Sequence, residues 1–273
     1  MEPSVERRHI DRNVRVHDRI AARYEATHDE IFNEVEQGRL RATLARAKAG
    51  IGAGPADGRP RALDFGCGSG NLTRHMLALG FEVVAADVSQ AFLDLVADRH
   101  AGERVATHRL DGESLAGLAD GTFDLVATYS VLHHVPDYLG AVREMARVAR
   151  PGGVVLIDHE HAPGYWSPDP LRDGFLRRAR RFDWRKFLVP ANYYGKLRRL
   201  LIDPHYANEG DIHVWPEDHI EWDRIAAALG EAGFAPLFAD DYLAYRAGYR
   251  RDLWEAYRHR LADMRAAAFV KAG

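Results

Sequence analysis

The sequence predicts an α/β protein built on a mostly parallel sheet with helices on both faces. Between residues 61 and 160, short apolar runs alternate with stretches of helical periodicity. Each apolar run also ends near an acidic or polar residue. Parallel strands need crossover connections of this length, and the helices in those connections cover both faces of the sheet. The alternation therefore predicts a doubly wound sheet.

The chain before this region is predicted to be helical. Residues 14–49 contain no proline and place Ile20, Tyr24 and His28 at a spacing of four, as on one face of a helix. Residues 50–60 are rich in glycine and proline, which predicts a loop that enters the main fold. We expect residues 1–55 to form an N-terminal helical cap.

The central region supplies five predicted strands and three predicted helices. Gly80 ends the first helix, Ser89 can cap the second, and the "RPGG" of residues 150–153 ends the third. The expected strands are residues 61–66, 81–87, 104–111, 123–130 and 154–160, and the expected helices are residues 71–80, 90–100 and 136–149. In such sheets ligands bind beyond the carboxyl ends of the strands. The residues to examine there are Asp64, Asp87, Asp111, Tyr129 and Asp158.

The alternation fails after Asp158. Residues 159–215 carry aromatic, proline and many basic residues, which predicts an insert. A helix at 215–234, a strand at 235–245, a helix at 250–264 and a last strand at 265–273 follow. We expect one domain over residues 1–273, with a core at 61–158 that is completed by residues 216–273.

Composition limits the class of protein. Hydrophobic residues make up 47% of the chain, charged residues 28%, and the net charge is −3, which argues weakly against a dedicated nucleic-acid binder. The N-terminus is too charged for a signal peptide, and no apolar run is long enough to span a bilayer. Cys67 is the only cysteine, so no intrachain disulfide can form. We expect a soluble cytoplasmic protein.

The "LDFGCGSGN" of residues 63–71 predicts a ligand-binding turn that favours a cationic ligand over a pyrophosphate. Three glycines at alternate positions follow Asp64, whereas the dinucleotide fingerprint reads G-x-G-x-x-G. An acid before the first glycine repels a pyrophosphate and suits a cation. S-adenosylmethionine carries an amino group, a sulfonium and no phosphate. Asp87 can accept from its two ribose hydroxyls and Asp111 from its adenine amino group, because a carboxylate only accepts.

Five motifs in order now resemble a known family, the class I S-adenosylmethionine-dependent methyltransferases of the small-molecule type. They are "LDFGCGSG", "VVAADVS", "LDGESL", "FDLVATYSVLHHVPD" and "ARVARPGGVVLID". The resemblance implies a Rossmann-like, seven-stranded mixed sheet whose last strand, residues 265–273, runs antiparallel. It also makes residues 61–158 the cofactor-binding core and S-adenosylmethionine the cofactor.

The resemblance implies a role for each residue of the cofactor site. Asp64, Gly66, Gly68 and Gly70 would hold the methionine portion, with Cys67 in the same turn. Asp87 with Val88 would bind the ribose, Asp111 with Gly112 the adenine, and Tyr129 and Ser130 would border the sulfonium. Tyr24 in the cap would lie over the cofactor. For Asp87, Asp111 and Tyr24 the alternatives are a helix cap, an ordinary turn residue and a helix-face core residue.

Histidines near the strand ends are the candidate general bases, because histidine titrates near neutral pH. In an extended strand Asp158 and Glu160 would share one face, and His159 and His161 the other. His161 is the first candidate, His159 the second and His134 the third. The alternatives are bonds from His159 and His161 to loop backbone, and a structural or pocket-wall role for His133 and His134. Nothing fixes a third metal ligand, so no metal is expected.

The insert is the other informative region. Residues 172–199 hold ten basic residues against Asp173 and Asp183, with an apolar stripe at helical spacing. This pattern fits a lid over an acidic or lipid-like substrate, or an element of residues 171–200 that contacts an anionic surface. A solvated basic helix packed by its apolar stripe is the plainer alternative.

The leading functional hypothesis is methylation of a small organic acceptor, at oxygen before nitrogen or carbon. A tRNA, rRNA or DNA methyltransferase is the alternative, and only the basic insert favours it. A non-methylating enzyme on the same fold is a third. The glycine spacing and Asp64 disfavour a nicotinamide oxidoreductase.

Overall fold

The computed structural model describes residues 30–53, 58–112, 114–179 and 220–273, together with residues 14, 18 and 28. Its strands are β1 (Arg61–Phe65), β2 (Glu82–Asp87), β3 (Val105–Arg109), β4 (Phe123–Tyr129), β5 (Ala149–His161), β6 (Phe234–Tyr242) and β7 (Met264–Lys271). Its helices are α3 (Glu34–Ala49), α4 (Asn71–Ala78), α5 (Gln90–Arg99), α6 (Tyr138–Val148), α7 (Pro170–Ala179), α9 (Trp222–Glu231) and α10 (Arg251–Tyr257), with a 3₁₀ turn η2 (Leu132–His134).

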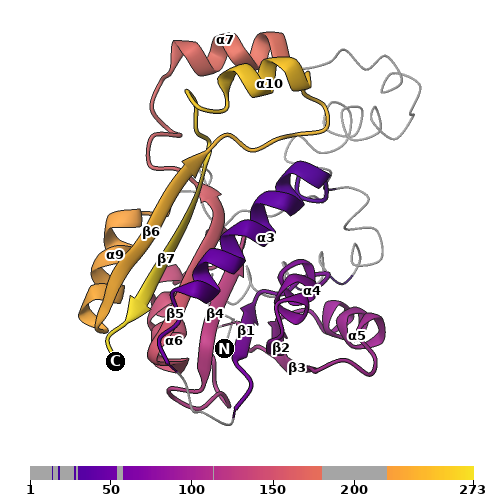
Figure 1. The fold of residues 1–273 in the computed structure, drawn as a ribbon, viewed down its shortest axis with the longest axis vertical. Coiled ribbons are helices and arrows are strands. Elements are labelled where there is room, and N and C mark those ends of the chain that lie inside the picture. The colour runs from indigo at the N-terminus through magenta and orange to yellow at the C-terminus, as the bar shows by residue number, and fades with distance from the viewer. Residues whose placement is uncertain are drawn as a thin grey trace, which may run out of the picture.

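The strands form one seven-stranded sheet in the order β3-β2-β1-β4-β5-β7-β6 (Figure 1). Strands β1 to β5 pair in parallel, and β7 pairs antiparallel with both β5 and β6. This confirms the predicted mixed sheet with an antiparallel last strand. Because β4 is central and covered on both faces, all seven of its residues are buried, as expected of a parallel strand.

Helices cover both faces because successive strand residues point to opposite sides. In β1, Ala62 belongs to a core with α3 and α4, whereas its neighbour Leu63 belongs to a core with α6 and α9. The first core includes Leu40, Leu44, Leu72 and Met76, and the second includes Val142, Met145, Ile225 and Leu229. Helix α5 packs on the α4 side through a smaller cluster around Cys67.

A second layer lies beyond the carboxyl ends of β5 and β6. Helix α7 follows β5, α10 lies between β6 and β7, and the two helices lie side by side at the top of Figure 1. Phe175 of α7 and Trp254 of α10 are buried in a separate apolar cluster. We call α7, α10 and this cluster the cap pair. Residues 180–219, which include most of the predicted insert, lie outside the described residues.

Candidate active site

The glycine turn after β1 needs backbone angles that glycine adopts most readily. Gly66, Gly68 and Gly70 all have positive φ, at 72°, 48° and 89°, a region costly for residues with a Cβ. A Cβ built on Gly66 would lie 2.6 Å from a methyl carbon of Val131, so the turn also packs closely on the loop after β4. A Cβ built on Gly68 would meet nothing within 4 Å, and Gly68 lines the cavity described below.

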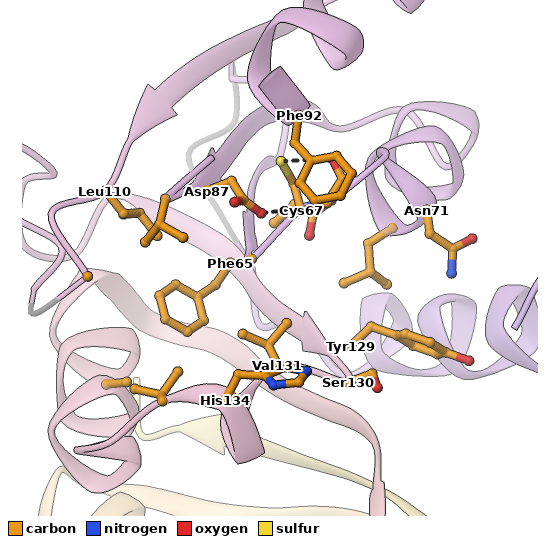
Figure 2. Close-up of a pocket in the computed structure, with 18 of the residues that line it drawn as sticks. Phe65, Cys67, Asn71, Asp87, Phe92, Leu110, Tyr129, Ser130, Val131 and His134 are labelled. Atoms are coloured by element: carbon orange, nitrogen blue, oxygen red, sulfur yellow. Dashed lines mark hydrogen bonds between the residues drawn. The ribbon is translucent and has the colours of Figure 1, made fainter. Parts of the chain in front are cut away.

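Asp87 at the end of β2 holds this turn in place. Its carboxylate accepts hydrogen bonds from the backbone N–H of Gly68 at 2.9 Å and of Ser89 at 2.8 Å. The residue is buried yet lines the cavity (Figure 2). Asp87 therefore organises the glycine turn and also faces the space in which a ligand would bind.

Asp64 is a buried carboxylate for which the described residues supply no ion-pair partner. It is 1% exposed, and the Thr73 hydroxyl donates to its Oδ2 at 2.6 Å. Burial raises its pKa from an ordinary 3.8 to about 7, even though the bond from Thr73 acts in the opposite direction. A cation placed beside Asp64 would stabilise the ionised form. The local electrostatics thus favour a positively charged ligand.

These residues line a cavity of about 340 Å³ at the carboxyl ends of β1, β2, β3 and β4. Phe65, Asp87, Leu110, Ser130 and His134 contribute from these ends and their loops (Figure 2). Ile31 and Phe32, just before α3, also line it. The predicted location beyond the strand ends is therefore the place where the structure has a cavity.

Most of the predicted cofactor residues come together at this cavity. Those that line it are Asp64, Gly66, Cys67, Gly68, Asp87, Val88, Gly112, Tyr129 and Ser130. Gly70 stands just behind as the residue before α4. Asp111 is exposed and accepts from the backbone N–H and hydroxyl of Ser114 at 2.8 and 3.0 Å. Its role toward adenine stays a prediction, as does that of Tyr24, which lies outside the described residues.

A buried charged network beside the cavity was absent from the sequence analysis. The Nη1 of Arg39 on α3 donates to both Asp158 oxygens at 3.0 Å, and its Nε donates to Glu36 at 2.9 Å. The Tyr242 hydroxyl donates to Asp158 at 3.1 Å, and the Arg39 guanidinium lies 3.9 Å above the Tyr242 ring. The spacing of Glu36 and Arg39 was the only sequence signal, and it fits any surface helix.

Two buried hydrogen-bond donors of this region form no hydrogen bond of good geometry among the described residues, although their side chains lie close enough to interact with one another. They are the Tyr129 hydroxyl and the Nη2 of Arg39. Orphaned buried donors carry a free-energy cost, so they mark places where a ligand oxygen could bind. Tyr129 lines the cavity, and the charge of Arg39 acts on it. Together they offer positive and neutral donors to an anionic group.

The end of β5 departs from simple strand alternation. His159 has a left-handed backbone with φ of 62°, and the pairing with β7 shifts between Ile157 and Glu160. As a result Asp158 and His159 both contact the Tyr242 hydroxyl, His159 through Nδ1 at 3.0 Å. The expectation that Asp158 shares a face with Glu160, opposite His159, was wrong, because the left-handed residue rotates the chain.

The candidate catalytic histidines occupy different surroundings. His134 lines the cavity, whereas His159 and His161 do not. His159 is stacked on Tyr129 at 4.7 Å between ring centres, and burial holds its pKa well below the ordinary value. His161 is stacked on Tyr165 at 3.8 Å, and its Nδ1 lies 3.3 Å from the Asp263 carbonyl oxygen. Each role as a base stays a prediction.

Within the described part of the chain, no group of three or more His, Cys, Asp and Glu side chains is placed to hold a metal ion. No described helix is long and apolar enough to cross a membrane.

Comparison with known proteins identifies the central region. A methyltransferase domain model matches residues 63–157. A ubiquinone biosynthesis O-methyltransferase from Ralstonia nicotianae is 34% identical over 151 residues, which cover 53% of this chain and 63% of that protein. One from Alkalilimnicola ehrlichii is 42% identical over 107 residues, covering 38% and 42%. The chain thus spans less than two thirds of the length of these relatives.

Solved structures extend the similarity to the whole fold. An S-adenosylmethionine-dependent methyltransferase from Mesorhizobium loti has a TM-score of 0.54 at 20% identity, covering 89% of this chain and 98% of its own. The [4+2]-cyclase SpnF has a TM-score of 0.53 at 18% identity, covering 87% and 82%. At these identities the structures establish the fold alone.

The cavity also fits S-adenosylmethionine. The buried carboxylate of Asp64 suits its cationic end, Asp87 faces the same space, and Tyr129, which lines the cavity and interacts with Arg39 behind it, suits its carboxylate. The ordered motifs, the mixed sheet, the cavity and the matched domain agree. Residues 63–157 of this chain match a methyltransferase domain, and the chain as a whole has the fold of S-adenosylmethionine-dependent methyltransferases.

Proposed function

We propose that this chain transfers a methyl group from S-adenosylmethionine to an oxygen atom of a small organic acceptor. The observation that carries the proposal is the juxtaposition at one sheet edge of an acid-fringed cavity and histidines at the ends of β4 and β5. The relatives named as ubiquinone biosynthesis O-methyltransferases support oxygen as the acceptor atom.

S-adenosylmethionine supplies an electrophilic methyl group on a positively charged sulfur when it is bound. The protein's main task is then to hold the acceptor in line, because positioning can supply roughly 7–11 kcal/mol of the barrier. Asp87 and Asp111 hold the nucleoside, and Asp64 with the glycine turn holds the methionine portion. Tyr129 and Ser130 border the sulfur. Arg39 joins this set as a donor toward the carboxylate.

A hydroxyl acceptor must lose its proton, and a positioned base contributes typically about 10²–10⁴-fold. The histidines proposed from the sequence are His161, His159 and His134. Of these, His134 has the best access to the cavity. The neutral state of buried His159 also suits a base, since a protonated imidazole cannot accept.

The cap pair supports a covered acceptor site. Helix α7 contributes Phe175 to the buried cluster and leaves Arg177 exposed, whereas the Arg178 guanidinium lies over the ring of Tyr257 at the edge of that cluster. This arrangement is the apolar stripe with a basic face that the sequence predicts. We propose that the insert is a lid over an acidic or lipid-like acceptor. Contact of residues 171–200 with an anionic surface, and a cytoplasmic location, stay predictions.

Two other functions are kept as alternatives. A nucleic-acid methyltransferase would need the basic insert to grip RNA or DNA. A non-methylating enzyme on this fold is favoured by one observation, since the similar SpnF structure is named as a cyclase.

Calorimetry with S-adenosylhomocysteine and a methylation assay test the proposal together. We expect micromolar binding, and transfer of the labelled methyl group from S-adenosylmethionine to an acidic catechol such as 3,4-dihydroxybenzoate. No binding at millimolar ligand contradicts the cofactor assignment. Binding with methylation of tRNA but of no small hydroxyl compound contradicts the acceptor assignment.

A further inference from the structure

Asn71, the first residue of α4, has a buried side-chain amide in the wall of the cavity. The residue is 8% exposed and lines the cavity. Its Nδ2 is buried without a hydrogen-bond partner among the described residues. A buried donor of this kind carries a free-energy cost unless a ligand or a water molecule accepts from it. The amide therefore marks a place where a ligand oxygen could bind.

Two groups of fixed polarity decide which end of the Asn71 amide is left for a ligand. The Arg74 guanidinium can only donate, and its Nη2 donates to Oε1 of Gln37 at 2.6 Å and to Oδ1 of Asn71 at 3.1 Å. The carbonyl oxygen of Ile31 can only accept, and Nε2 of Gln37 donates to it at 2.9 Å. The same Nε2 donates to Oδ1 of Asn71 at 3.0 Å. Two donors thus hold the amide oxygen of Asn71, and its NH₂ group is the end without a partner.

The surroundings of this NH₂ group favour a negatively charged ligand atom. Asn71 is the first residue of α4 after the N-cap Gly70, and the N-terminus of a helix carries partial positive charge. The Arg74 guanidinium on the oxygen side of the amide adds a full positive charge. A carboxylate oxygen that accepts from Nδ2 of Asn71 would therefore lie in a positive local potential.

Asp64 offers the opposite preference at the same end of α4. The hydroxyl of Thr73, two residues after Asn71, donates to Oδ2 of Asp64 at 2.6 Å, and Asp64 also lines the cavity. The first turn of α4 thus brings together a carboxylate that suits a cation and an amide that suits an anion. The amino group and the carboxylate of an α-amino acid are attached to one carbon, so a ligand of this kind needs both groups close together. The chemistry fits the amino-acid end of a ligand.

Asn71 also lies away from the part of the cavity that is expected to hold the nucleoside. Figure 2 shows Asn71 and Tyr129 on one side of the cavity and Leu110, just after β3, on the other, with Asp87 between them. A ligand with its ribose at Asp87 and its adenine beside Leu110 would extend its other end toward Asn71.

We propose that Asn71 binds the carboxylate of the methionine portion through its Nδ2 and that Gln37 positions the amide, an inference that rests on the cofactor of the proposed function. The Nδ2 donates to a carboxylate oxygen of S-adenosylmethionine, whose amino group lies beside Asp64. Gln37 and Arg74 hold the amide oxygen on the other side, so that it does not turn toward the ligand carboxylate and repel it. Asn71 and Gln37 thereby select ligands with an intact amino-acid end.

Three adenosine thioethers separate the parts of the ligand, and calorimetry measures the Kd of each. S-adenosylhomocysteine carries the amino group and the carboxylate, S-adenosyl-3-thiopropylamine carries the amino group alone, and 5′-methylthioadenosine carries neither. The variant Asn71→Asp replaces the NH₂ group by an oxygen. Its other oxygen can still accept from Gln37 and Arg74, so the contacts between α3 and α4 are kept.

The largest loss is expected for the ligand with the carboxylate. The Kd for S-adenosylhomocysteine should rise by about 100-fold in Asn71→Asp, where two carboxylates face each other, and by about tenfold in Asn71→Ala. The Kd for 5′-methylthioadenosine should stay within about threefold of wild type in both variants, which also reports an intact fold. S-adenosyl-3-thiopropylamine should bind Asn71→Asp at least as tightly as wild type, because the new carboxylate attracts its amine. A merely structural role for Asn71 would weaken the binding of all three ligands together.

The variant Gln37→Leu tests the positioning role. It removes a bond that holds the amide oxygen, so the Kd for S-adenosylhomocysteine should rise by about threefold to tenfold, and that for 5′-methylthioadenosine should not change. In the Asn71→Ala background Gln37→Leu should add almost nothing, because the two residues act as a unit. Gln90→Glu is the matched control. It makes the same amide-to-acid change at the exposed start of α5 and should bind all three ligands like the wild type.

Two results would overturn this inference while the proposed function stands. One is a Kd of Asn71→Asp for S-adenosylhomocysteine within threefold of wild type, and the other is an equal loss of affinity for S-adenosylhomocysteine and 5′-methylthioadenosine. Failure of the proposed function gives a different pattern. A wild type that binds none of the three ligands contradicts the cofactor and this inference with it. A wild type that discriminates among the ligands as expected, yet methylates no hydroxyl compound, contradicts the acceptor alone.

Discussion

The two halves of the carboxyl edge of the sheet are built in different ways. At β1 and β2 the contacts are local, for Asp87 bonds to Gly68 and Ser89, 19 and 2 residues away. At β5 they are remote, for Asp158 bonds to Arg39 and Tyr242, 119 and 84 residues away. Contacts between residues close in sequence form a motif that can be recognised from the chain alone. Contacts assembled from distant segments, as at β5, leave no such motif.

Removing the ion pair between Arg39 of α3 and Asp158 of β5 should have the largest effect on the free energy of unfolding. Arg39→Met would leave Asp158 buried without its cation, and breaking a buried pair in this way costs about 3–5 kcal/mol. The free energy of unfolding, measured in urea, should fall by this amount. The control is Arg46→Met, whose partner Asp240 is half exposed, so less than about 1 kcal/mol is expected. Equal small losses in both variants would show that the Arg39–Asp158 ion pair stabilises the fold no more than a surface ion pair does.

The variant Asp87→Ala tests the contacts at the carboxyl ends of β1 and β2. This change removes two charge-assisted bonds within the turn and the expected ribose contact, each such bond contributing about 1.5–3 kcal/mol. Affinity for S-adenosylhomocysteine should fall by about 100-fold or more by calorimetry. Asp94→Ala on the exposed side of α5 is the control and should bind like the wild type. Unchanged affinity in Asp87→Ala would contradict the assignment of the whole cavity.

The raised pKa of Asp64 predicts a pH dependence of binding. Free protein holds its proton up to about pH 7, whereas a bound cation favours the carboxylate, so binding releases a proton below that pH. Affinity for S-adenosylhomocysteine should therefore rise by about tenfold between pH 6 and 8. Calorimetry in buffers of different ionisation enthalpy measures the proton release. Asp64→Asn should flatten the pH profile, and a profile equally steep in that variant would assign the dependence to another group.

The raised pKa of Asp64 has the opposite effect on the stability of the ligand-free protein, which should fall as the pH rises. The unfolded chain ionises Asp64 near pH 3.8, while the folded chain keeps the proton to about pH 7. The contribution of Asp64 to the free energy of unfolding is therefore lost as pH rises through this window. Asp64→Asn should remove that part of the pH dependence.

A substitution in the cap pair should have the smallest effect on the global stability of the protein. Phe175→Ala removes a buried ring from its separate cluster, so the loss should appear as local opening. Hydrogen exchange should quicken in α7 and α10, while the Tm and the Kd for S-adenosylhomocysteine change little. By contrast, Leu63→Ala in the main core should lower the free energy of unfolding by about 2–5 kcal/mol. A global loss in both variants would show that the cap pair unfolds together with the sheet.

The sequence by itself determined the parallel core and the cofactor cavity. Strand periodicity, helix caps and the glycine turn are properties of neighbouring residues, so the order of elements and the positions of Asp64, Asp87 and Tyr129 could be read from the chain. The antiparallel direction of the last strand, which lies between β5 and β6, came from resemblance to a family, because it depends on how remote segments pair.

The tertiary structure alone decided the contacts at the end of β5. Strand periodicity predicted that Asp158 and Glu160 share one face. Because His159 between them has a left-handed backbone, Asp158 contacts Tyr242 whereas Glu160 contacts His133. Tyr242 gave no signal, and the spacing of Arg39 from Glu36 gave none specific to this site, because both side chains contact a carboxylate from a segment far away in sequence. Hydrogen bonds and desolvation act over a few ångströms of space, and only folding brings those atoms within reach of one another.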